Sequence, residues 1–272
     1  MEPFIIKNES LLTIDGWMNS NPGLVAGITT KLGGQSKGSF EALNLGFHVG
    51  DIFNDVCSNR MKVSELLDFP LDSWVSAEQT HDIFLQKITK ADRGRGSISY
   101  EQSFKSTDGF YTSEEGVLLT LCFADCVPLF FIAPEYRMIG AAHAGWKGTV
   151  GQIACEMIKK WEEEGIKAEK VFVAIGPSIC EKCYIVDERV VNLVENILED
   201  VDRKPYNLIS EGQYSLNLRE LNKQILVKAG VPMENIIVTD YCSSCNNHLF
   251  FSHRKSHGKA GRMLSFIGWK EN

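Results

Sequence analysis

Two apolar runs in the middle of the chain constrain its fold more than any other feature. The first, Val117–Phe123, is followed by Cys126 and Pro128, and the second, residues 138–142, ends at His143. Short continuous apolar runs that stop at such residues are typical of buried strands. We therefore predict two buried strands, each of which ends beside a soft metal ligand.

The second run leads into a glycine-containing turn and a helix. Gly145 and Gly148 flank Trp146 and Lys147, and apolar residues recur with helical spacing over residues 149–164. A turn that opens a helix presents unpaired backbone N–H groups and the positive end of the helix dipole. We expect an anion to bind there.

The remaining segments alternate between strand and helix patterns. Strands are predicted at residues 24–29, 74–77, 83–88, 171–175, 236–239 and 264–267. Helices are predicted at residues 54–67 with Asn54 as N-cap, at residues 188–198, and at residues 217–230, where Asn217 and Glu220 resemble a capping box. This order predicts a mixed α/β architecture with helices outside and sheet inside. The chain shows no linker or internal repeat, so we expect one domain over residues 1–272.

Composition and charge exclude several functional classes. The net charge of −7 argues against a general binder of nucleic acid or anionic membranes. No apolar run approaches the length of a membrane span, and the N-terminus does not resemble a secretory signal. We expect a cytoplasmic protein in which the eight cysteines are thiols or metal ligands; its oligomeric state stays open.

His81, Cys126 and His143 form a candidate metal site. Each ends or bends an apolar segment, and ligands from separate strands can converge at one mouth of a sheet. Three protein ligands leave a fourth position for water or substrate, as in catalytic zinc sites. A single copper also accepts these ligand types, whereas a multicopper cluster needs more imidazoles than the six histidines here. Alternatively, the three are unrelated polar residues, or Cys126 is the nucleophile and His143 the base of a metal-free cysteine hydrolase.

Four further cysteines form two Cys-x-x-Cys pairs, Cys180/Cys183 and Cys242/Cys245. Such pairs can build a structural zinc site. Because apolar residues follow Cys183 where a turn would be needed, we favour buried, unreactive thiols over a four-cysteine site.

Seven motifs together resemble the YlmD/YfiH-type family, which is also described as polyphenol oxidase or laccase-domain proteins and is associated with purine nucleoside phosphorylase activity. In chain order they are GITTKLGGQSKGSF, LNLGFHVGD with Asn59-Arg60, EQTH, FADCVPL, AAHAGWKGT, AIGPSIC with Cys183-Tyr184, and FFSHR with Gly261-Arg262-Met263. The match extends from Leu24 to Trp269, which is nearly the whole chain.

The resemblance implies a layered α/β/β/α-type sandwich with mixed sheets, similar to a toxin's cysteine deamidase domain. It implies that His81, Cys126 and His143 hold zinc. It further implies phosphorolysis of adenosine, inosine and methylthioadenosine to the free base and (methylthio)ribose 1-phosphate, and deamination of adenosine to inosine. Copper-dependent polyphenol oxidation is the older attribution and stays an alternative.

The resemblance also suggests catalytic and substrate-binding residues. For deamination, zinc would lower the pKa of a water toward ~7 for attack at C6 of adenine. Asp125, beside Cys126, is a candidate proton shuttle, although the signature motifs of zinc nucleobase deaminases are absent. Cys126 and His143 complete the expected catalytic set.

Phosphorolysis requires cations near the ribose. Arg60 and Lys147 are our candidates for phosphate, and Asn44 and Gln79 for the base or ribose. Arg60 lies in the apolar stripe of its predicted helix, so it either reaches the rim of the core or is held inward for a polar ligand. Lys147 stands where the family often has arginine, which keeps the charge but loses the bidentate geometry.

Overall fold

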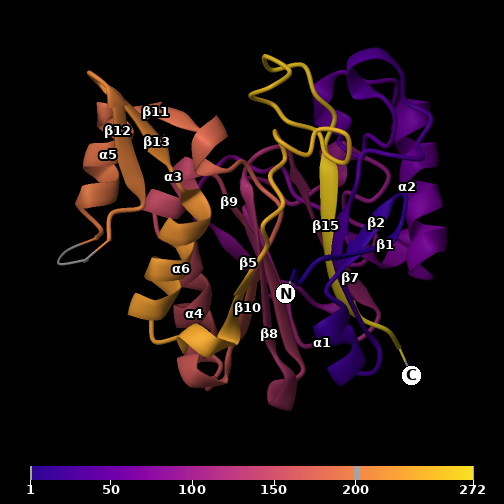
Figure 1. Cartoon of the computed structure of the whole chain (residues 1–272). Helices are drawn as coiled ribbons and strands as arrows, with labels where there is room; N and C mark the ends of the chain where they lie inside the picture. Colours follow the sequence, from indigo (N-terminus) through magenta and orange to yellow (C-terminus); the bar gives the residue numbers. More distant parts are fainter. Residues whose placement is uncertain (1, 199–202, 272) are drawn as a thin grey trace.

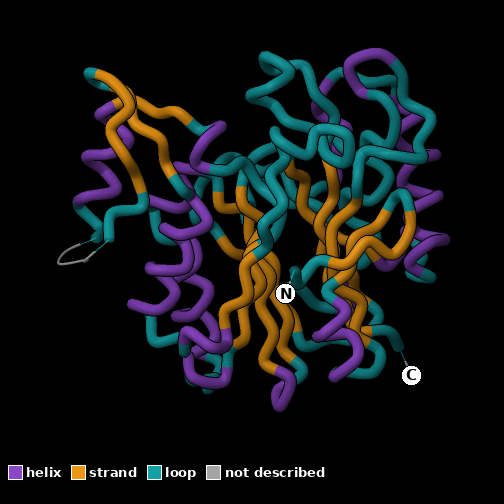
Figure 2. Tube along the Cα trace, viewed as in Figure 1, coloured by secondary structure: helices purple, strands orange, loops and turns teal. Residues whose placement is uncertain are grey.

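The computed structural model describes residues 2–198 and 203–271. In this part of the chain, two six-stranded sheets pack face to face between helices (Figure 1, Figure 2). The first sheet has the order β1 (Ile5–Asn8), β2 (Leu11–Thr13), β3 (Leu24–Thr29), β15 (Met263–Trp269), β7 (Val117–Phe123), β4 (Trp74–Val75). The second has the order β14 (Ile236–Val238), β10 (Phe172–Ile175), β8 (Val127–Ala133), β9 (Met138–Ala144), β6 (Gly109–Thr112), β5 (Leu85–Lys87). Both sheets contain parallel and antiparallel pairs, so the predicted mixed sheets are confirmed.

Helices cover the outer faces of both sheets. The helices are α1 (Asp15–Ser20), α2 (Phe53–Leu67), α3 (Trp146–Val150), α4 (Ile153–Glu163), α5 (Glu188–Glu195) and α6 (Leu218–Lys228). Apolar residues of α2 pack on the first sheet, and those of α4 and α6 pack on the second. A small sheet, β11 (Ile185–Asp187), β13 (Gln213–Leu216) and β12 (Tyr206–Ser210), lies beside α5 (Figure 1). The predicted α/β/β/α layering is confirmed.

Strand β8 shows why the central strands are continuously apolar. Leu129 and Phe131 face the helical layer, where Phe131 packs against Trp161 of α4. Phe130 and Ile132 point the other way, into the core between the two sheets. Because both faces are buried, alternation of apolar and polar residues disappears.

Several predicted boundaries are wrong. The helix after His143 begins at Trp146 instead of residue 149, and Gln152, with a φ of 65°, divides it into α3 and α4. Pro128 lies inside β8, one residue from its start, where the missing N–H is tolerated. Helix α2 begins at Phe53, so Asn54 is not its N-cap. The predicted cap at Asn217 is confirmed, because its side chain accepts the N–H of Glu220.

Among the described residues, no helix is long and apolar enough to cross a membrane.

Candidate metal centre

His81, Cys126 and His143 converge at one end of the second sheet. One ligand atom from each residue lies within 4.8 Å of the other two. Cys126 directly precedes β8 and His143 lies near the end of β9, and antiparallel pairing of these strands brings the two together. His81 reaches the same point from the segment between β4 and β5, with a φ of 62° and its ring 4.7 Å from that of His143.

Asp108, which the sequence analysis did not identify, holds both histidines. Its Oδ1 atom lies 2.8 Å from Nδ1 of His143 and accepts the backbone N–H of His81 at 3.0 Å. Its Oδ2 atom accepts the N–H groups of Thr80 and Asp82 at 3.0 and 2.9 Å. A carboxylate behind a histidine is the usual second shell of a metal site, because it fixes the ring and leaves Nε2 for the cation. The only signal in the sequence is an aspartate directly before a strand.

Gly145 leaves room for the close approach of Cys126 and His81. A Cβ atom at this position would lie 3.0 Å from the Cys126 sulfur and 3.0 Å from Cδ2 of His81. Gly145 is also the N-cap of α3, so the glycine turn recognised in the sequence passes directly beside Cys126 and His81.

The charges at the site favour a thiolate. Burial raises the pKa of Cys126, but the charge of His143 and hydrogen bonds with both histidines outweigh it and lower this pKa well below its usual value. Burial likewise lowers the pKa of His143, but the thiolate and Asp108 outweigh it and raise this pKa. The deprotonated sulfur is the form that binds a metal or acts as a nucleophile.

Two adjoining cavities open onto the ligands. The first, of about 250 Å³, is lined by His48, Gln79, His81, Cys122, Ala124, Cys126, His143, His253 and Arg262. The second, of about 200 Å³, shares His81, Ala124, Cys126 and His253 with it and adds Asp125, Trp146, Ile179, Tyr184, Leu218 and Arg254. Sequence reasoning gave no role to His48, His253 or Arg262, although all three stand in the motifs that carry the family resemblance. A larger cavity of about 580 Å³, lined in part by Lys31, contains none of the three ligands, so volume alone does not locate the site.

Two of the predicted substrate-binding residues mainly support other groups. Both ends of the Gln79 amide are bonded to the backbone of Cys122, at 2.9 and 2.7 Å, while the side chain lines the first cavity. Asn44 is buried; its Oδ1 accepts the backbone N–H of Arg262 and its Nδ2 donates to Asp51. Asn44 therefore positions a residue that lines the cavity.

The two predicted phosphate contacts lie outside these cavities. Arg60 is held inward: its guanidinium donates to the carbonyls of Leu45, Gly96 and Ser97. Lys147 is exposed, with its ammonium 5.8 Å from the ring centre of Trp146, which lines the second cavity.

Asp125 lines the second cavity, but both carboxylate oxygens have partners. They accept the hydroxyl of Ser243 and the backbone N–H of Arg254, each at 2.6 Å. The side chain thereby joins the loop before β8 to the segment that follows β14.

The donor set fits a metal ion. Two imidazoles and one thiolate suit zinc or a single copper ion. In residues 2–198 and 203–271, the second group that could hold a metal consists of four cysteines and no histidine. These donors do not fit a multicopper centre, which needs many imidazoles.

Comparisons with known proteins find relatives over nearly the whole chain and a matching fold. The family model described as "Multi-copper polyphenol oxidoreductase laccase" matches residues 25–270. Purine nucleoside phosphorylase YlmD of Geobacillus stearothermophilus is 49% identical over 261 residues, covering 94% of this chain and 95% of the relative. The protein of the same name from Bacillus subtilis is 47% identical over 273 residues, covering 99% and 98%. A crystal structure of YlmD from Geobacillus stearothermophilus superposes with a TM-score of 0.97 at 47% identity and covers 100% of both chains. The chain therefore belongs to the laccase-like polyphenol oxidoreductase family, together with the YlmD proteins.

Proposed function

We propose that this chain is a zinc-dependent purine nucleoside phosphorylase that converts adenosine, inosine and methylthioadenosine to the free base and the corresponding (methylthio)ribose 1-phosphate. The observation that carries the proposal is the set of His81, Cys126 and His143, backed by Asp108, at the junction of two cavities. The names of the relatives supply the reaction class. Zinc held by these residues would supply a Lewis acid that stabilises developing negative charge.

The two cavities differ in chemistry, which suggests how the substrates divide. Arg262 lines the first cavity and could bind phosphate through charged hydrogen bonds. His48 lines the same cavity, but burial and the charge of Arg262 lower its pKa to about 4, so it would offer phosphate a neutral ring N–H. Trp146 and Tyr184 line the second and offer aromatic faces against which a purine can pack. The reacting atoms would then meet beside Cys126, which lines both. Lys147, next to Trp146, stays a candidate for a phosphate contact at the rim.

Adenosine deamination is a second proposed activity, favoured by the position of Asp125 between Ala124 and Cys126 in the second cavity. Each Asp125 oxygen already accepts one hydrogen bond, from the Ser243 hydroxyl or the Arg254 N–H, and keeps a second lone pair that could take a proton. Because the signature motifs of zinc nucleobase deaminases are absent from the chain, we expect deamination to be slower than phosphorolysis.

The experiment is a product assay on protein purified without added metal. Incubation with inosine is expected to release hypoxanthine only when phosphate is present, and adenosine is expected to give adenine with a smaller amount of inosine. Zinc near one equivalent per chain at this site supports the proposal. If the copper-loaded protein oxidises phenols and leaves nucleosides intact, the oxidase alternative is favoured. If the metal-free protein hydrolyses an acyl or amide substrate, the cysteine-hydrolase alternative is favoured.

A further inference from the structure

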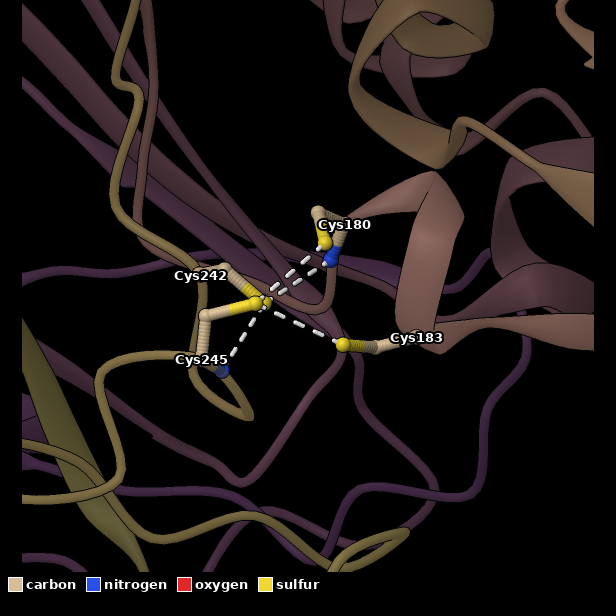
Figure 3. A group of neighbouring side chains, drawn as sticks. All are labelled: Cys180, Cys183, Cys242 and Cys245. Atoms are coloured by element: carbon tan, nitrogen blue, oxygen red, sulfur yellow. Dashed lines mark hydrogen bonds between the residues drawn. The ribbon is translucent and has the colours of Figure 1, made fainter.

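The two Cys-x-x-Cys pairs meet at one point, although Cys183 and Cys242 lie 59 positions apart in the chain (Figure 3). Cys180 and Cys183 lie at a short 3₁₀ turn that follows β10, and Cys242 and Cys245 lie in the segment that follows β14. The four sulfur atoms all lie within 4.8 Å of one another. Cys242 is buried, Cys245 is exposed and the other two are half-buried, so the expectation of buried thiols is wrong for three of the four.

The sulfur separations fit a shared metal ion. The Cys245 sulfur lies 3.8 Å from that of Cys180 and 3.5 Å from that of Cys183. Four thiolates placed tetrahedrally about ~2.3 Å from a zinc ion are ~3.8 Å apart. A disulfide needs sulfurs at about 2.05 Å. The four side chains point toward a common centre (Figure 3).

Backbone donors converge on one of the sulfurs. The N–H groups of Cys180 and Cys245 donate to Sγ of Cys242 at 3.2 and 3.3 Å. Backbone N–H groups that donate to a ligating sulfur are typical supporting contacts of a metal–sulfur site.

The surrounding backbone holds the two segments together before any ion binds. Ser178 pairs with Cys242 as an isolated β-bridge, and the Ser243 N–H donates to the Ser178 carbonyl at 3.1 Å. Asn246 closes the second turn, since its Oδ1 accepts the Cys242 N–H and its own N–H donates to the Cys242 carbonyl. A site with ligands placed in this way loses little conformational entropy on binding.

We propose that Cys180, Cys183, Cys242 and Cys245 bind a structural zinc ion, separate from the His81, Cys126 and His143 site. Four protein ligands fill the tetrahedral shell and leave no position for substrate, which is the arrangement of a structural site.

This ion would also stabilise the loop that carries Cys126. Ile179, next to Cys180, donates its N–H to the Asp125 carbonyl at 2.9 Å. Ser243, next to Cys242, donates its hydroxyl to the Asp125 carboxylate. The zinc therefore ties together the two segments that hold Asp125, the residue directly before Cys126.

Metal analysis of four full-length proteins tests this proposal. Wild type is expected to hold two zinc ions per chain, and Cys245→Ser and Cys126→Ser one each. Cys57→Ser, on α2 and outside both clusters, is the matched control and is expected to keep two. Cys245→Ser with the zinc content of wild type, or iron in place of zinc, would overturn the proposal. Wild type could instead hold a single zinc ion that is kept in Cys126→Ser and lost in Cys245→Ser. That result would support the four-cysteine site and contradict zinc binding at the proposed active site.

A second measurement covers the case in which Cys245→Ser does not fold. A thiol-binding mercurial added to folded Cys126→Ser protein, with a metal indicator present, is expected to release one zinc per chain. No release, or mass spectrometry of denatured wild type showing disulfides among these four cysteines, refutes the proposal.

Discussion

Replacing Asp108 by asparagine is expected to weaken both metal binding and folding. The carboxylate of Asp108 is fully buried and has five partner groups: Nδ1 of His143, the backbone N–H groups of residues 80, 81 and 82, and the Thr80 hydroxyl. Burial raises the pKa of this carboxyl, but its bonds to His143 and to the backbone outweigh that effect and hold the pKa below its usual value. It is therefore ionised at neutral pH.

The magnitude follows from the lost acceptor. Asparagine has one oxygen, which can accept hydrogen bonds on only one side of the former carboxylate. Its NH₂ group then faces at least two donors on the other side. Leaving buried donors unsatisfied costs about 1–3 kcal/mol each, so Asp108→Asn is expected to lower the free energy of unfolding by roughly 2–6 kcal/mol. Loss of the group that orients a ligating histidine is expected to weaken zinc binding about 10–100-fold.

Two assays check this prediction. Competition with a chelator of known affinity measures zinc binding at the His81, Cys126 and His143 site. This assay uses a Cys245→Ser background, in which the proposed four-cysteine site no longer binds zinc. Urea denaturation measures stability. Asp82→Asn is the matched control, because the Asp82 side chain is exposed and accepts only the N–H of Ile83. Zinc affinity in Asp108→Asn within twofold of that in the parent would refute the assignment of Asp108 as the residue that positions His143.

Three further changes test other parts of the structure. Gly145→Ala places a Cβ atom 3.0 Å from the sulfur of Cys126 and is expected to weaken zinc binding about tenfold, as measured by chelator competition. Gly16→Ala is the control, because its Cβ atom meets no atom within 4 Å. Equal zinc affinities of the two variants would contradict the prediction. Arg262→Ala is expected to raise the KM for phosphate about tenfold or more in steady-state kinetics while zinc content stays unchanged, and an unchanged KM would remove Arg262 from the phosphate site. Trp161→Ala deletes a side chain with 0% exposure and is expected to cost about 3–5 kcal/mol of unfolding free energy in urea, whereas a loss below about 1 kcal/mol would contradict the packing of α4 on the sheet.

Strands β3, β7, β9, β10 and β15 were recognisable because burial makes them largely apolar. Strand β8 is buried on both faces as well but was not predicted, because Pro128 near its start indicated the end of a strand. Strand β12, by contrast, is mostly exposed and shows no periodicity of burial, so the small sheet was missed. The division of the helix at Gln152 was also missed, because a left-handed residue other than glycine leaves no mark in the sequence.

The sequence predicted the site residues whose side-chain type is itself informative, and it missed those whose role depends only on tertiary contacts. His81, Cys126 and His143 stand out as soft ligands at the ends of apolar segments. Asp108 does not, because its bond to His143 spans 35 positions of the chain. The apolar stripe around Arg60 left open whether the arginine reaches the rim or is held inward. It gave no sign of the acceptors, which are carbonyls 15 to 37 positions away.

The central claim is that His81, Cys126 and His143 hold the metal that phosphorolysis requires. The most direct measurement compares wild type with Cys126→Ala for zinc content and for phosphate-dependent release of hypoxanthine from inosine, with Cys155→Ala as the control outside both cysteine groups. We predict that Cys126→Ala loses one zinc and all turnover together, while Cys155→Ala keeps both. Full phosphorolysis by a Cys126→Ala protein that lacks this zinc would contradict the claim.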